Sequence, residues 1–234
     1  MYTLVERSAA LRSQHERDWH SNPDLPTEHQ HVILANELLD NLAFDIAERS
    51  EDGWAPVLVD AVAGELVLQP GEIETGLAFL DELAPDVDQG SRVPVATQAR
   101  AWVDHARAHS DHLLVFDYGE TTAVLAARQQ PGWLRTYAGH ERGGDPLDQI
   151  GHRDITHDVP IDQLPPPDNH QRQADWLQSN GLPERVEQAR QTWTERAHIG
   201  DLEAMVARSA IGEAEALTDP TGLGAFHTLH WRGW

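Results

Sequence analysis

The sequence predicts an α/β protein organised around a mainly parallel sheet. Two short apolar runs, 31–36 and 112–117, are typical of strands that are buried on both faces in the middle of such a sheet. Segments with helical spacing alternate with them, as in α/β folds. Parallel sheets bind ligands just past the carboxyl ends of their strands. The polar residues that follow the two runs are therefore the first candidates for a site.

The composition is strongly acidic, with 39 Asp and Glu residues, 17 basic residues that are all arginine, and a formal net charge of −22. A surface of this sign repels phosphate groups, so we expect no nucleic-acid partner and no anionic membrane partner. A cationic partner, such as an arginine-bearing protein segment, would be attracted. The length of 234 residues predicts one domain, 1–234, with a sizeable core.

The chain has no cysteine, which excludes disulfides, thiolate metal sites and a cysteine nucleophile. No basic region followed by an apolar core opens the sequence, and the apolar runs are too short to span a bilayer. We therefore expect a cytoplasmic protein. The sequence does not indicate a hydrolase or a nucleotidase, because it contains neither the nucleophile motif Gly-x-Ser-x-Gly nor a phosphate-binding loop.

The N-terminal third predicts a strand over 1–6, then a helix over 9–19 with Ser8 as its N-cap. A connection over 21–30 has room for a very short strand. Past the buried strand at 31–36, the pattern changes to short strands at 44–49, 54–62 and 65–69. Glycine-containing turns separate these strands, so the region 44–70 predicts a β-meander.

The rest of the chain alternates again between helices and strands. Apolar spacing predicts an amphipathic helix over 97–109 before the second buried strand, whose sharp exit turn suits Gly119. Short strands in 131–164 flank a glycine-rich loop. The last part, 171–234, predicts helices over 171–180 and 184–198, with Gly181 ending the first, and a final strand over 225–231 that fits an antiparallel position.

Candidate site residues follow the two buried strands. Asn36 and Glu37 come directly after the first, and Asp40 could face the same pocket from the first turn of a following helix. Alternatively, Asn36 caps that helix and the two carboxylates only occupy its first turn. Asp117 and Tyr118 end the second strand and could line the pocket, or Asp117 could cap a turn.

Several motifs resemble the MidA-like family of S-adenosylmethionine-dependent methyltransferases, in the family's order along nearly the whole chain. The central one is Ala35-Asn36-Glu37-Leu38-Leu39-Asp40. The others are Val5-Glu6-Arg7-Ser8-x-x-Leu11-Arg12-x-x-His15, Asp117-Tyr118-Gly119, Leu134-Arg135-x-Tyr137-x-x-His140, Asp154-Ile155-Thr156-His157, and Gly222-Leu223-Gly224-x-Phe226. The family includes the mitochondrial complex I assembly factor, a protein arginine methyltransferase.

The resemblance implies a Rossmann-like class I methyltransferase sheet with the meander 44–70 and a substrate-side region 131–164 as insertions. It implies S-adenosylmethionine as cofactor and a protein arginine as methyl acceptor. Glu37 and Asp40 would bind the guanidinium in fork geometry, with Asn36 positioning the acceptor and contacting the cofactor. Glu6 would accept hydrogen bonds from the cofactor ribose, unless it is only a frayed terminal charge.

The same resemblance implies an acceptor side of the pocket that is built by residues of the second half of the chain. The residues implied are Asp117, Tyr118, Tyr137, His140 and Asp154, with Thr156 beside them. Hydrogen bonds within a loop-rich region would explain the last four nearly as well.

One departure from the family pattern is large. The family's first strand and glycine-rich cofactor turn would precede Tyr2, so the sheet looks N-terminally truncated, which would leave two neighbouring strand edges exposed. Three explanations compete: a start codon placed too far downstream, a second copy or partner chain that supplies the missing part, or a relative that has lost its cofactor. The last would be a non-catalytic binding or assembly factor.

The 14 histidines raise the question of a metal site. His105, His109 and His112 are spaced by four and three residues, which would align two of them on one helix face. No carboxylate follows at a matching spacing. We therefore expect no metal.

Overall fold

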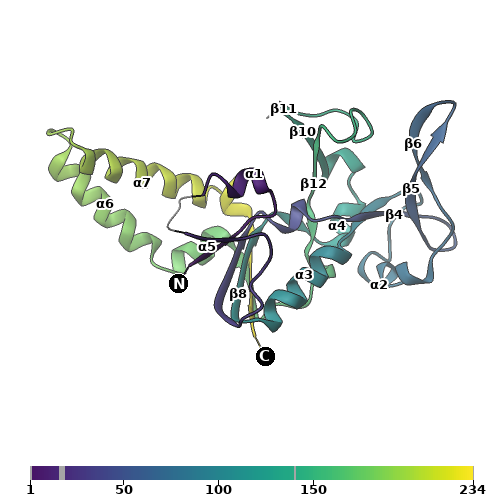
Figure 1. Ribbon diagram of the computed structural model, residues 1–234, viewed down its shortest axis with the longest axis horizontal. Coiled ribbons are helices and arrows are strands. Elements are labelled where there is room, and N and C mark those ends of the chain that lie inside the picture. Colours follow the sequence, from purple (N-terminus) through teal and green to yellow (C-terminus); the bar gives the residue numbers. More distant parts are fainter. Residues whose placement is uncertain (1, 16–18, 140, 234) are drawn as a thin grey trace.

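The centre of the computed structural model, which describes residues 2–15, 19–139 and 141–233, is a four-stranded mixed sheet of order β14-β15-β8-β3 (Figure 1). The predicted buried strands are β3 (Gln30–Asn36) and β8 (Ser110–Asp117), which run parallel. The final strand β15 (His227–Arg232) is antiparallel to β8, as expected, and β14 (Asn169–Arg172) forms the edge beyond it.

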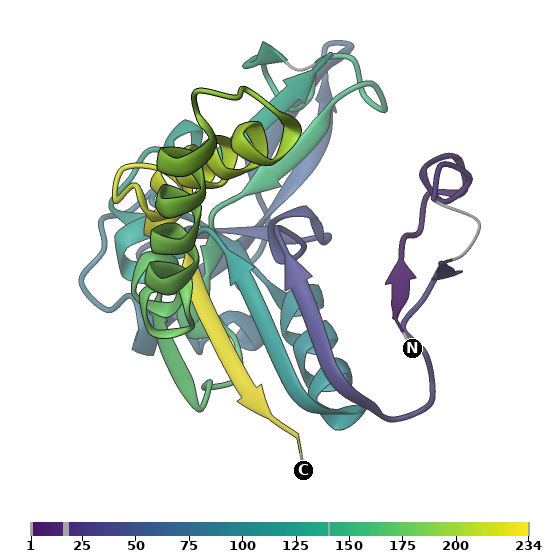
Figure 2. The same ribbon diagram turned by 90° about the vertical axis from the view of Figure 1, so that its left-hand side faces the viewer.

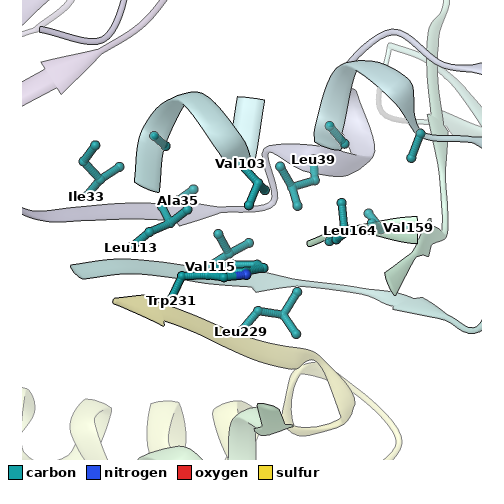
Figure 3. Packing of buried hydrophobic residues seen from close by; sticks show 13 residues of the cluster. Ile33, Ala35, Leu39, Val103, Leu113, Val115, Val159, Leu164, Leu229 and Trp231 are labelled. Carbon is teal, nitrogen blue, oxygen red and sulfur yellow. The ribbon is translucent and has the colours of Figure 1, made fainter. Parts of the chain in front are cut away.

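One face of this sheet is covered by the predicted amphipathic helix, α3 (Thr97–Ala108). Val103 of this helix packs with Leu113 and Val115 of β8 and with Leu229 and Trp231 of β15, all of them nearly inaccessible to solvent (Figure 3). On the opposite face, α5 (Gln173–Ser179) places Trp176 edge-on against Phe116, with 5.1 Å between ring centroids.

The expectation that the strand at 31–36 is buried on both faces is wrong. Ile33 and Ala35 lie in the core beneath α3, but Val32 and Leu34 on the other face are 58% and 61% exposed. Side chains stand perpendicular to a sheet, so this exposure shows that the face of β3 away from α3 is left uncovered. β3 also bonds to β8 on one side only, and no strand of the described residues pairs with its other edge. β3 is an edge strand with the composition of a central one.

The N-terminal segment lies beside this open edge without joining it (Figure 2). β1 (Thr3–Val5) pairs in parallel with β2 (His20–Asn22), the very short strand expected in the connection. None of the described residues before 23 is buried. The strand of 1–6 is therefore not hydrogen-bonded to the main sheet, and the two neighbouring edges that the resemblance led us to expect, on β1 and β3, both lack a partner among the described strands.

The helix expected over 9–19 is shorter in the structure. α1 (Ala9–Arg12) is capped by Ser8, whose hydroxyl accepts the Leu11 N–H at 3.3 Å, and it ends after one turn. Residues 16–18, at the end of the expected helix, lie outside the described residues.

The predicted meander is confirmed as β4 (Asp45–Arg49), β5 (Trp54–Val62) and β6 (Glu65–Pro70). A fourth strand, β7 (Arg92–Val95), completes a sheet of order β6-β5-β4-β7. The sequence analysis gave no strand over these residues, and Pro94 within β7 fits the edge position that the strand occupies. The turns η2 (Thr75–Leu77) and α2 (Leu80–Leu83) close a second core beneath this sheet.

Region 131–164 forms a third, small sheet with β10 (Leu134–Ala138) between β11 (Glu141–Arg142) and β12 (Asp154–His157). β9 (Gly119–Glu120) continues from β8 and pairs in parallel with β13 (Val159–Pro160). The short helical elements nearby are η1 (Leu39–Asn41), α4 (Thr122–Ala126), η3 (Gln130–Gly132) and η4 (Ile161–Gln163).

The C-terminal helices form a hairpin, α6 (Leu182–Arg196) and α7 (Leu202–Thr218), at the end of the long axis opposite to the meander (Figure 1). Gly181, with φ of 91°, separates α5 from α6 as expected. The sequence analysis missed α7, although Asp201 caps it by accepting the Ala204 N–H. The turn η5 (Leu223–Ala225) leads into β15. No helix among the described residues is long and apolar enough to cross a membrane.

Gly119 is needed for a different reason from the sharp turn that the sequence suggested. A Cβ at this position would lie 2.1 Å from the carbonyl oxygen of Val159, so only glycine lets β9 and β13 approach. We expect Gly119→Ala to lower the free energy of unfolding by about 3 kcal/mol, the upper end of the usual range for overpacking. Urea unfolding of the two proteins measures the difference.

Gly212, on the exposed side of α7, supplies the matched control. A Cβ there has no atom within 4 Å. Gly212→Ala should raise stability by about 0.5–1 kcal/mol through helix propensity. Equal effects of the two substitutions would show that the approach of β9 to β13 carries no steric constraint.

Candidate active site

A cleft of about 1420 Å³ lies where the carboxyl ends of β3 and β8 meet the small sheet of β10 and β12. Its other wall is built by the start of α5 and by loop 220–226. Its position follows from the topology, because the carboxyl ends of parallel strands lie at one edge of a sheet, where ligands bind in α/β proteins.

Glu37 leaves β3 in a backbone conformation that is rare for residues other than glycine. Its φ is 48°, and its N–H donates to the carbonyl of Phe116 at 2.9 Å, which continues the β3–β8 ladder for one more residue. The turn directs the Glu37 side chain to the cleft, where its carboxylate accepts from the Asn36 amide at 3.3 Å. Strained residues of this kind concentrate at functional sites.

Asp40 lies on the η1 turn and is held by Tyr118, the residue after β8. The Tyr118 hydroxyl donates a short hydrogen bond to Asp40 Oδ2, and the Asn41 amide donates to Oδ1 at 2.8 Å. Beneath them, Asp117 accepts the N–H of Leu39 at 2.8 Å and that of Tyr118 at 2.9 Å. Asp117 thus joins the end of β8 to the turn that carries Asp40.

Burial shifts the acidities of this cluster. Desolvation, reinforced by the charge of Asp40, raises the pKa of Asp117 to about 8. Desolvation also raises the pKa of Asp40, against the opposing hydrogen bond from Tyr118, and that bond together with burial raises the pKa of Tyr118. At neutral pH, the two buried carboxyl groups therefore do not both carry a full charge.

His157, at the end of β12, supports the η1 turn from below. It is fully buried, its ring stacks on Phe44 with centroids 4.0 Å apart, and its Nδ1 lies 3.1 Å from the Asp40 carbonyl oxygen. Desolvation lowers its pKa to about 4, so it is neutral at physiological pH and donates from Nδ1 to that carbonyl.

Arginines form the side of the cleft next to Tyr118. Arg135 of β10 lies over the Tyr118 ring, 5.0 Å from its centroid, and pairs closely with Asp158. Arg128 pairs with the same carboxylate at 3.0 Å. Asp158 is nearly buried, so it fixes both guanidinium groups and, through Arg135, the face of the Tyr118 ring.

The cleft as a whole is acidic. Its lining includes Tyr137 and six carboxylate residues: Glu37, Asp40, Glu120, Asp154, Asp158 and Asp175. Three arginines, Arg128, Arg135 and Arg172, oppose them. The excess of negative groups favours a cationic ligand.

The structure brings together six of the residues expected at the site, all of which line the cleft: Glu37, Asp40, Tyr118, Tyr137, Asp154 and Thr156. Two others lie next to it: Asn36 contacts Glu37, and Asp117 is buried beneath the surface in the turn-capping role that the sequence left open. Neither lines the cleft wall.

Glu6 stands apart from the cleft lining, and its carboxylate accepts the N–H of Ser8 at 2.7 Å. Its position at the end of β1 is as expected, but β1 is not joined to the main sheet. His140 lies outside the described residues.

Sequence reasoning missed the residues that position the others. Arg135 and His157 stand inside recognised motifs but received no role, whereas Arg128, Asp158 and Arg172 carried no signal. The three histidines considered for a metal are divided in the structure: His105 and His109 are neighbours, with centroids 4.4 Å apart, while His112 contacts His230 at 3.0 Å. Within the described ranges, no group of three or more His, Asp or Glu side chains could hold a metal ion.

The structure is that of an α/β protein with a large cleft at the carboxyl ends of its parallel strands. A family model described as "Putative S-adenosyl-L-methionine-dependent methyltransferase" matches residues 1–181. The chain belongs to this S-adenosyl-L-methionine-dependent methyltransferase family, which is the MidA-like family that its motifs resemble. No curated protein matches the chain significantly.

Two solved structures from Burkholderia thailandensis share the fold. One, a superfamily member described as a "likely methyl transferase" and bound to S-adenosyl-homocysteine, has a TM-score of 0.76 and 22% identity, covering 99% of this chain and 63% of its own. The other, an uncharacterized member, has a TM-score of 0.73 and 21% identity, covering 92% and 58%. The chain therefore spans about three fifths of the length of these relatives.

The left-handed backbone conformation of Glu37 predicts that residue 37 lowers the stability of the folded protein unless it is glycine. A Cβ in this region costs roughly 1–2 kcal/mol, so Glu37→Gly should be about that much more stable than Glu37→Ala in urea unfolding. Both variants lose the carboxylate, so the difference between their free energies of unfolding reports the cost of the backbone conformation at residue 37. Equal stabilities would show that residue 37 is not strained.

The lowered pKa of His157 predicts a specific dependence of stability on pH. The unfolded chain protonates this histidine near 6.5 and the folded chain near 4, so its contribution is complete above pH 6.5 and falls as the pH drops to 4. We expect His157→Gln to reduce the slope of unfolding free energy against pH by up to about 1.4 kcal/mol per pH unit.

The difference between the two slopes, measured by urea unfolding across this range, isolates His157. His227, whose pKa is also lowered to about 4, and Asp117, which titrates in the opposite sense, are present in both proteins. Identical slopes would mean that His157 titrates normally in the folded state.

Proposed function

We propose that this chain is the acceptor-binding part of an S-adenosylmethionine-dependent methyltransferase that methylates a protein arginine side chain. The observation that carries the proposal is the placement of Glu37 and Asp40 together at an acidic cleft, at the carboxyl ends of the sheet, in a member of this family. The family membership supports methyl transfer, and the charge of the cleft supports a cationic acceptor.

The two carboxylates have different tasks in this proposal. The guanidinium of arginine stays protonated throughout the physiological pH range, so no side chain removes its proton before transfer. A carboxylate instead binds the guanidinium, turns one nitrogen toward the methyl donor and stabilises the charge that remains. Glu37 is the stronger ligand, because the Tyr118 hydroxyl already occupies one oxygen of Asp40. Asp40 and Tyr118 then form the second side of the acceptor pocket, with Tyr137 and Asp154 farther along it.

S-adenosylmethionine, when bound, would supply the methyl group of its sulfonium, which the acceptor nitrogen would take by in-line attack on the methyl carbon, with the thioether S-adenosylhomocysteine as the leaving group. The described residues fit this cofactor only in part. Asn36 and Glu37 stand at the strand end where this fold class binds it, but the exits of β1 and β3, which are Glu6-Arg7-Ser8 and Glu37-Leu38-Leu39, contain no glycine. Neither exit gives the close backbone approach that a glycine-rich turn provides.

We therefore propose that a further strand, followed by a glycine-rich turn, completes the cofactor site by pairing between β3 and β1. Both strands present unpaired edges, and Val32 and Leu34 are exposed on β3 as on a strand that lacks a neighbour. A longer form of the same protein is one source of this strand, and a partner chain is another.

The same observations favour a second candidate function, a non-catalytic binding or assembly factor that no longer holds the cofactor. Calorimetric titration with S-adenosylmethionine tests whether this chain holds the cofactor without the further strand. Binding in the micromolar range supports the transferase. No heat from a chain that is folded by circular dichroism supports the second function, or a cofactor site completed by another chain.

Glu37→Gln tests the role of the acceptor carboxylate. The variant keeps the shape of the side chain but not its charge, so we expect unchanged cofactor affinity and a loss of transfer by about 10²–10³-fold, as for other groups that stabilise reacting charge. The measurement is incorporation of labelled methyl groups into protein, with methylarginine identified after hydrolysis. Transfer at the original rate would remove Glu37 from the site, and labelling of another residue type would refute the arginine acceptor.

A further inference from the structure

The β5–β6 hairpin extends beyond the rest of its sheet as an arm, defined here as residues 57–70. β4 pairs only with the first residues of β5, from Trp54 to Pro56, and from Val57 onward β5 pairs with β6 alone. Figure 1 shows the arm at one end of the long axis, away from the central sheet and from the cleft wall at β12. None of its residues is buried.

The two faces of the arm differ in chemistry. Opposed residues of an antiparallel pair share a face, so the register assigns three pairs to one face: Val57 with Pro70, Val59 with Leu68, and Ala61 with Leu66. All six of these side chains are apolar. On the opposite face, every pair includes a polar residue: Leu58 with Gln69, Asp60 with Val67, and Val62 with Glu65.

The apolar face is exposed to a degree that its composition does not explain. Val59 and Leu66 are 57% and 43% exposed. A two-stranded hairpin is only marginally stable by itself in water, and an isolated ribbon gains nothing from an apolar face that packs on no core. A contiguous exposed apolar face therefore marks an interaction surface.

The charge around the arm restricts what can cover this face. Residues 50–75 contain six acidic side chains and no basic one. The preceding residue, Arg49, already pairs with Asp81 and lies over the Trp54 ring. A second copy would bring an equal negative charge against the arm, whereas a basic segment would be attracted to it.

We propose that the arm docks a segment of another protein that carries apolar side chains flanked by arginine or lysine. The apolar residues would cover Val59, Ala61, Leu66 and Leu68, and the basic residues would reach the surrounding carboxylates. An extended segment suits the arm best. Asp60 blocks part of the free edge of β5 by accepting the Ala61 N–H at 2.7 Å, while β6 pairs on one side only among the described strands.

This inference does not depend on methyl transfer, although the same chemistry would suit a protein that presents an arginine to the cleft. Its test therefore uses binding alone. The probe is a fluorescein-labelled peptide of alternating valine and arginine, compared with one of alternating valine and glutamate, by fluorescence anisotropy against the whole chain. We expect the arginine peptide to bind and the glutamate peptide not to bind.

Matched variants locate the binding face. Val59→Thr with Leu68→Thr makes the apolar face polar while both positions carry a β-branched residue suited to a strand. It should weaken binding of the arginine peptide at least tenfold. Leu58→Thr with Val67→Thr makes the same change on the opposite face and should alter binding less than twofold. Equal losses from the two pairs would overturn the assignment of the face.

A further measurement requires no variant. Raising the salt concentration screens the carboxylates, so the affinity for the arginine peptide should fall, while salt-independent binding would overturn the charge argument. Sedimentation of the chain alone tests the competing occupant. A dimer that Val59→Thr with Leu68→Thr dissociates would show that a second copy covers the face and would refute the proposal.

Discussion

The carboxyl group of Asp117 holds the candidate site together. It accepts the N–H of Leu39 from one strand exit and that of Tyr118 from the next, so a single buried side chain fixes the η1 turn relative to the end of β8. Asp40 and Tyr118 then meet as a consequence, and their hydrogen bond forms the floor of the cleft. The arrangement is costly, because two carboxyl groups are buried beside each other, and the raised pKa of Asp117 reflects that cost. Two backbone donors offset part of it, and His157 secures the same turn from its other side by donating to the Asp40 carbonyl.

The parts of the fold that could be predicted are those with a local signal. β3, β8, α3 and the meander follow from runs of apolar residues, helical spacing and turns, all of which are properties of short segments. The predictions that were wrong concern which strands or helices pack next to a segment, which the segment's own sequence does not show. The composition of β3 is that of a strand with neighbours on both sides, and nothing within residues 30–36 reveals that one neighbour is absent from the described structure. β7, at the edge of its sheet, was missed because its four residues, Arg92–Val95, give no run long enough to indicate a strand. α7 went unrecognised although an N-cap, Asp201, stands before it.

The residues of the candidate site also fall into those that the local sequence predicts and those that it does not. Glu37, Asp40 and Tyr118 could be predicted because they directly follow strands, and the topology of a parallel sheet then places them together. Arg128, Arg135 and Asp158 could not be, since their meeting depends on the pairing of β10 with β12 and on where α4 ends. Arg128 and Asp158 are 30 residues apart in the sequence, and neither has a spacing that indicates the other. His157 is harder still, because one of 14 histidines becomes distinctive only through complete burial against Phe44.

The open edge of β3 also accounts for the position of Glu6. Figure 2 shows β1 and β3 pointing the same way, with the N-terminal pair of strands set apart from the sheet. Carboxyl ends of parallel strands align only when the strands belong to one sheet. A strand that paired with both β3 and β1 would therefore do two things at once. It would pair with the free edge of β3, next to the exposed Val32 and Leu34, and it would bring the end of β1, with Glu6, into line with Glu37 and Tyr118. In the proposed arrangement, the strand that completes the sheet would also complete the cofactor site, so the affinity for cofactor and the stability of β1 and β2 would rise together.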